Sequence, residues 1–142
     1  MPIVDRDLKL RAALVQAVRD ANMGIPFGVQ NSDFSKPTDG SSPWAFVYYI
    51  PNIPSVATLG DAGEDAVDGL LQIDLNYPLR QGEGAVLQMS SRLASFFTAG
   101  KGLTYEDVKV KVLGCGHRPG REEDGWWRVS VRVTWSARVP RN

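Results

Sequence analysis

The last long stretch of the chain alternates strictly between apolar and polar residues. From Trp127 to Arg138, odd-numbered positions carry tryptophan, valine or alanine, and even-numbered positions carry arginine, serine or threonine. Successive side chains of a β-strand point to opposite faces of a sheet, so this pattern predicts a strand with one face on a core. The other face would meet water or a polar partner. No polar residue interrupts the apolar row, which favours a scaffold over a catalytic pocket.

Periodicity predicts the remaining elements. Helical spacing indicates one helix that starts at Asp5 or Asp7 and ends before Gly24, and a second between Gly84 and Gly100. Residues 44–50, 70–77 and 108–113 have strand patterns, residues 25–43 are typical of a loop or edge strand, and residues 114–125 of a turn. We therefore expect an α+β fold: a mostly antiparallel sheet of four or more strands, two helices packed on one face, and a long arm or hairpin. Residues 1–142 are expected to form a single domain.

The strand at residues 44–50 is apolar on both faces. Its two rows are Trp44, Phe46, Tyr48 and Ile50, and Ala45, Val47 and Tyr49. This pattern favours either a central strand buried on both sides or a strand whose outer face is covered by another subunit.

Residues 51–69 form a connection of a length that is uncommon in compact domains and is usually functional or disordered. Ile53, Val56 and Leu59 make part of it apolar, and an exposed apolar cluster usually marks a contact surface. The same segment carries an acidic cluster that misses the spacing of a calcium loop, so solvated charge is the simplest interpretation. Its members are Asp61, Glu64, Asp65 and Asp68.

Composition and charge argue against several classes of function. Apolar residues make up 43% and charged residues 23%, and the formal net charge is zero, so the chain lacks the basic footprint of a nucleic-acid or anionic-membrane binder. The first residues contain no apolar run typical of a secretory signal, and no stretch is apolar enough to predict a transmembrane helix. With a single cysteine, no internal disulfide can form.

The sequence contains few candidates for catalytic, phosphate-binding or metal-binding residues. Residues 114–120 are rich in glycine but lack the spacing of a phosphate-binding loop, so a hairpin turn is favoured. Cys115 and His117 are two residues apart without a third orienting group, and four zinc ligands are not available. We expect no catalytic residue, no metal site and no cofactor. Arg128, Arg132 and Arg138 share the polar row of the last strand, either as a solvated face or as a polar protein interface.

Several segments together resemble one known family. They are Leu10–Leu14, Pro43–Tyr49, the acidic arm, Gly69–Pro78, Gly82–Gly84 and Asp124–Val131. These segments, which span nearly the whole chain, are similar to the small tail terminator proteins of bacteriophages with long non-contractile tails. The similarity lies in patterns rather than in catalytic signatures.

The resemblance implies a virion protein assembled in the host cytoplasm. Tail terminator proteins form a hexameric ring that caps the head-proximal end of the tail tube, stops tube growth and offers the surface that joins the head, and the resemblance implies the same for this chain. The implied partners are further copies of the chain, the major tail tube protein and head–tail connector proteins; DNA only passes through the lumen. Carboxylates lining that lumen would repel phosphate, which is a second interpretation of the acidic cluster. The alternatives are a neck or head-completion protein of the same phage and, from a different class, a small ligand-binding or enzymatic domain.

Overall fold

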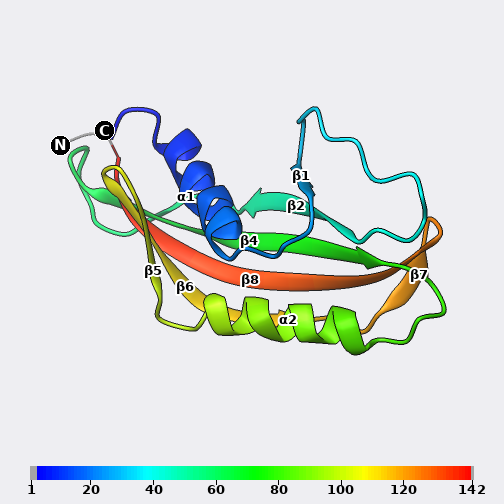
Figure 1. The fold of residues 1–142 in the computed structure, drawn as a ribbon. Coiled ribbons are helices and arrows are strands. Elements are labelled where there is room, and N and C mark those ends of the chain that lie inside the picture. Colours follow the sequence, from blue (N-terminus) through cyan, green and yellow to red (C-terminus); the bar gives the residue numbers. More distant parts are fainter. Residues whose placement is uncertain (1–2, 142) are drawn as a thin grey trace.

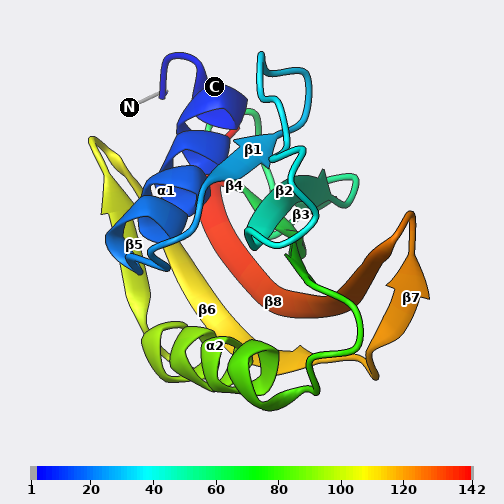
Figure 2. The ribbon, with the colours of Figure 1, turned by 45° about the vertical axis from the view of Figure 1, so that its right-hand side comes forward.

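The computed structural model describes residues 3–141, in which two helices pack against an eight-stranded, mixed and curled sheet (Figure 1, Figure 2). The elements in chain order are α1 (Arg6–Asp20), β1 (Phe27–Val29), β2 (Trp44–Pro51), β3 (Ser55–Val56), β4 (Glu64–Tyr77), α2 (Gly84–Phe96), β5 (Gly102–Tyr105), β6 (Val108–His117), β7 (Arg121–Glu123) and β8 (Trp126–Pro140). No helix in these residues is long and apolar enough to cross a membrane.

The sheet is arranged around the pairing of β4 with β8. The strand order is β1-β2-β4-β8-β6-β5, with β3 added to β4 and β7 added to β8. β4 and β8 pair without interruption from Glu64↔Pro140 to Tyr77↔Trp127. Every pairing within residues 3–141 is antiparallel except that of β1 with β2, which is parallel. The sheet is therefore mixed, because the edge strand β1 pairs in parallel with β2. β1 lies within residues 25–43, for which the sequence left open a loop or an edge strand.

The apolar row of β8 lies in the core, as its alternation predicts. Val129, Val131, Val133 and Trp135 are fully buried beside the inward row of β4, and the apolar faces of both helices join the same core. Tyr49 stacks on Trp135 with ring centroids 5.7 Å apart and an interplanar angle of 14°. A pair of this kind contributes about 0.5–1.5 kcal/mol beyond its buried area.

The two predicted helices are confirmed, but the capping of α1 at its N-terminus and the last residue of α2 differ from the expectation. Asp5 occupies the N-cap position of α1 in a left-handed conformation with φ of 56°, and its side chain makes no capping hydrogen bond. α2 begins at Gly84 and ends at Phe96, before the glycine that was expected to stop it.

Two strand boundaries predicted from the sequence are wrong, and two strands were not predicted. β4 begins at Glu64 rather than at residue 70, because its first half pairs with the end of β8. β6 runs on to His117, and β7 then forms within the segment interpreted as a turn. β5 was not predicted. Each error concerns a polar or glycine-rich segment that becomes a strand through its partner rather than through its own periodicity.

The outer face of β2 is partly covered by the chain itself. The ring of Phe34, from the loop after β1, lies 6.0 Å from Trp44 and 6.4 Å from Phe46, measured between centroids. Phe34 packs on Gly28, where a Cβ atom would come within 2.4 Å of the ring, so this close approach requires glycine. Trp126 meets Trp44 edge-on at 5.9 Å. Among the side chains on this outer face of β2, Ile50 is exposed, and Phe46 and Tyr48 are half-buried.

Candidate interaction surfaces

The arm, defined here as residues 52–63, is a hairpin extension of the sheet rather than an open loop. Its short strand β3 pairs with β4 through Ser55↔Ala66 and Val56↔Asp65. Three apolar side chains project from it almost without cover: Ile53 is 93% exposed, Val56 62% and Leu59 92%. Exposed apolar groups gathered on one ordered element are typical of a contact surface.

Arg141 fastens the arm to the body of the protein. Its guanidinium donates hydrogen bonds to the backbone carbonyls of Gly60, of Thr58 at 2.6 Å and of Glu64 at 2.9 Å. The same group pairs with Asp65, with Nε 2.9 Å from Oδ1. The backbone N–H of Arg141 donates to the carbonyl of Gly63. One side chain near the end of the chain therefore fixes the arm.

Asp65 is a buried carboxylate held by two arginines. Besides Arg141, Arg6 of α1 lies 3.1 Å from Oδ2 and also donates to the carbonyl of Pro140. The hydrogen bond from Arg141, followed by that from Arg6, lowers the pKa of the Asp65 carboxyl from its usual value. The cluster ties α1, the first residues of β4 and the end of β8 together.

The four acidic residues of the predicted cluster do not share one face. Asp65 points to the buried side of β4, whereas Glu64 and Asp68 lie on the other side of that strand. Glu64 lies 3.4 Å from Arg138, and the Asp68 carboxylate accepts a hydrogen bond from the Asn52 side chain at 2.9 Å. Asp61 lies on the exposed turn of the arm. The sequence could not separate them, because it did not place the start of β4.

A ladder of polar side chains follows the outer face of β4 and β8. Each rung joins two residues directly opposite each other in the register. The rungs are Arg128 to Asn76 (Nε to Oδ1, 2.7 Å), Ser130 to Asp74 (Oγ to Oδ1, 2.6 Å) and Arg132 to Gln72 (Nε to Oε1, 3.3 Å). Asp74, Asn76 and Ser130 are buried, so this part of the polar row is not the solvated face that its polarity suggests, whereas Thr134 and Arg138 further along β8 are exposed. Buried polar groups persist where hydrogen bonds satisfy them, as here.

The two arginines predicted as a polar interface have different surroundings. Arg128 is largely covered and lies within 3.7 Å of Asp124 and 4.0 Å of Glu123, so its charge is engaged within the chain. Arg132 makes no ion pair among residues 3–141. It opens on a cavity of about 460 Å³ shared with Arg118 and Arg121. Of the pair, Arg132 is the one available to a partner.

Cys115 and His117 do not form a reactive pair. Burial raises the pKa of the Cys115 thiol to about 11, which is opposite to the shift that a nucleophilic thiolate needs. His117 is exposed, and its Nδ1 lies 3.0 Å from the carbonyl oxygen of Arg118. Within residues 3–141, no group of three or more histidine, cysteine, aspartate or glutamate side chains could hold a metal ion.

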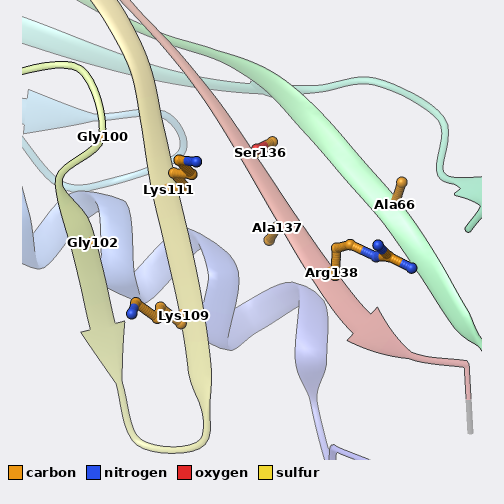
Figure 3. A pocket seen from close by; sticks show the side chains of 8 residues that line it. All are labelled: Ala66, Gly100, Gly102, Lys109, Lys111, Ser136, Ala137 and Arg138. Carbon is orange, nitrogen blue, oxygen red and sulfur yellow. The ribbon is translucent and has the colours of Figure 1, made fainter.

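A groove that the sequence did not predict lies where β6 and β8 separate (Figure 3). Its volume is about 690 Å³, and three cationic side chains border it: Lys109, Lys111 and Arg138. The alternation of lysine and valine in β6 predicts that these lysines point outward, but it contains no sign that the neighbouring strand diverges. The remaining lining residues are small.

Comparison with known proteins identifies the family. The family described as phage tail terminator protein matches residues 9–135. The chain belongs to this family. The resemblance inferred from the sequence is thus confirmed, and this terminator-family protein has a structural role in a phage tail.

Solved structures share the fold of the terminator-family protein. One is 21% identical with a TM-score of 0.70, and the match covers 95% of this chain and 96% of the other. Another, titled as the virion of a native gene transfer agent particle, is 14% identical with a TM-score of 0.51 and coverage of 97% and 99%. No curated protein matches the chain.

The Asp65 cluster predicts how stability depends on pH. Because the pKa of Asp65 is lower in the folded state than the unfolded value of about 3.9, its ionised form stabilises the fold above about pH 4. That contribution disappears as the pH falls through the folded pKa. We expect Asp65→Asn to lower the urea midpoint at pH 7, and the gap from the natural protein to narrow below about pH 4.

Urea unfolding at several pH values between 7 and the acid limit measures this gap. Asp33→Asn is the matched control, because it removes a carboxylate that is exposed and makes no ion pair among residues 3–141. A gap between Asp65→Asn and the natural protein that stays constant down to pH 3 would contradict the role given to the ionised carboxylate.

Proposed function

We propose that six copies of this protein form a ring that caps the head-proximal end of the phage tail tube. In this role the ring ends tube polymerisation and offers the surface that head–tail connector proteins join. Family membership supports the proposal, and the observation that carries it is the arm, which presents Ile53 and Leu59 to solvent on a segment fastened by Arg141. An ordered apolar projection has a use in assembly and none in a monomer.

The arm is suited to contact either a neighbouring subunit or the tail tube protein. Its side chains are exposed while its backbone is already bonded to β4 and Arg141, so little order has to be gained on binding. Preorganisation of this kind reduces the entropic cost of association. Arg132, with its uncommitted charge, is proposed as a polar contact at the opposite half of β8.

We assign the repulsion of DNA in the lumen to Asp61, Glu64 and Asp68 rather than to the whole acidic cluster. Asp65 is excluded from this role because two arginines neutralise it inside the fold. The other three lie on the arm or on the outer side of β4. Carboxylates along a passage would keep DNA phosphates from binding, whereas lysines would retain them.

A neck or head-completion protein is the second candidate. It would share the ring and the virion location, but its arm would contact head connector proteins rather than the tube. A ligand-binding or enzymatic role has weaker support, because burial raises the pKa of the Cys115 thiol and the matching family is that of phage tail terminators. Partner identity therefore distinguishes the remaining candidates.

The proposed function predicts a specific defect when the protein is absent. A phage with an early stop codon in this gene is expected to make headless tails of abnormal and variable length, because tube subunits continue to add at an uncapped end. Electron microscopy of lysates measures the tail lengths, and a plasmid copy of the gene should restore them. Headless tails of uniform normal length would favour the neck protein, and normal virions would overturn both candidates.

Complementation of the same phage tests the arm. Ile53→Ser with Leu59→Ser removes two side chains that are almost fully exposed, so the urea midpoint should stay close to that of the natural protein, while tail capping should fall at least about tenfold. Leu113→Ser is the matched control, since Leu113 is an exposed leucine outside the arm. Full capping by the arm variant, or an equal loss with the control, would show that the arm is not the contact surface.

The lumen assignment predicts a kinetic effect. Asp61→Lys with Asp68→Lys should leave tail length normal but slow DNA ejection at low salt, because lysines would attract phosphate. The delay should shrink as salt rises and screens that attraction. Asp33→Lys, an exposed reversal in the loop after β1, is the control. Ejection at the natural rate in low salt would overturn the lumen assignment of these carboxylates.

A further inference from the structure

The groove in Figure 3 exists because two paired strands separate. β6 and β8 are paired as far as Lys111↔Ser136. Beyond that point β6 continues to Val108 and β8 continues to Pro140 without pairing with each other. Two strand edges therefore face each other across the groove, and such edges can pair with another extended segment.

The groove is closed on its inner side and open on its outer side. Val108, Val110, Ala137 and Val139 are buried, and α1 packs against β5 and β6 beneath them. On the outer side small residues border the opening, and the aliphatic part of Lys109 lies over Gly102, where a Cβ atom would come within 2.7 Å of its Cε. An extended backbone can therefore approach the strand edges closely.

The charge of the groove selects an acidic occupant. Lys109 and Lys111 make no ion pair among residues 3–141, and Arg138 has one exposed partner in Glu64 at 3.4 Å. Uncompensated cations beside free strand edges fit an extended segment that carries carboxylates.

The chain carries such a segment at the other end of the same strand. β7 and the start of β8 form a hairpin whose tip, Asp124 and Gly125, has φ values of 53° and 83°, as a tight two-residue turn requires. Within residues 3–141, β7 pairs only with β8, so its other edge has no strand partner there. Glu122 is exposed and makes no ion pair among residues 3–141.

The two features cannot meet within one molecule. The hairpin pairs with β8 at Trp127 and the groove lies at Ala137, near opposite ends of this strand (Figure 1). The ten residues between these positions rise about 33 Å along the strand. We infer that the β7–β8 hairpin of one subunit docks in the β6–β8 groove of the next, with Glu122 facing Lys109 and Lys111. This inference rests on the proposed ring, because a contact between different surfaces of identical subunits repeats head to tail and gives a ring where its rotation closes.

Charge reversal on each side, and on both sides together, tests the contact. Glu122→Lys and the pair Lys109→Glu with Lys111→Glu should each weaken self-association at low salt about five- to tenfold, because attraction becomes repulsion. The chain with all three changes should recover most of the natural affinity, because opposite charges again face each other. Lys36→Glu, an exposed reversal outside both surfaces, should have no effect. Sedimentation equilibrium of the purified proteins measures the affinity.

The outcomes separate this contact from the proposed function. Urea unfolding of each variant verifies that the exposed substitutions leave the fold intact. An oligomer whose affinity none of the variants changes, or single defects that the combined chain does not repair, overturns the hairpin–groove contact and leaves the ring standing. A natural protein that stays monomeric at high concentration also overturns it, and the tail lengths of the complemented phage then report on the proposed function independently.

Discussion

The uninterrupted antiparallel pairing of β4 with β8 is the constraint on which the rest of the structure depends. Because side chains alternate along both strands, one register decides at once which residues enter the core and which form the outer ladder. Leu71 faces Val133 inside, and Asp74 faces Ser130 outside. A shift of one residue would exchange the two faces of β8 and place arginines in the core.

The polar groups that this register buries are matched within the chain. Asp65 would be costly at the buried start of β4, but Arg6 and Arg141 supply two ion pairs, and Arg141 also satisfies carbonyls of the arm. At the other end, hydrogen bonds between opposite residues satisfy Asp74 and Asn76. Exceptions are the indole nitrogens of Trp44, Trp127 and Trp135, which are buried without a hydrogen-bond partner among residues 3–141. For these we have no physical account.

The same two strands bring the proposed contact surfaces to the ends of the molecule. The arm and the β6–β8 groove lie where β4 begins and β8 ends, and the β7–β8 hairpin lies where β8 begins. A subunit that must touch a different surface of its neighbour needs unlike features at opposite ends, and a long strand pair separates them rigidly. The role of a phage tail terminator in assembly is consistent with contacts at the periphery rather than with convergent chemistry in a pocket.

By itself, the sequence determined the elements with strong periodicity. The alternation from Trp127 to Arg138, the inward row of the second half of β4 and the apolar stripes of the helices needed no knowledge of distant residues, because each depends on local geometry. The pattern of segments also sufficed for the family. The exposed apolar residues of the arm were found because Ile53 and Leu59 stand out in a polar segment.

Only the tertiary structure determined which polar side chains are buried and where neighbouring strands separate. The burial of Asp65, the covered outer face near Asn76 and the gap between β6 and β8 all follow from partners far away in the chain, such as Arg141 for Asp65. The β6–β8 register shifts between Val112 and Gly114, and the pairing stops at Lys111. Local sequence cannot specify where two strands diverge, because that position depends on the packing of α1 beneath them and on the pairing of each strand with its other neighbour.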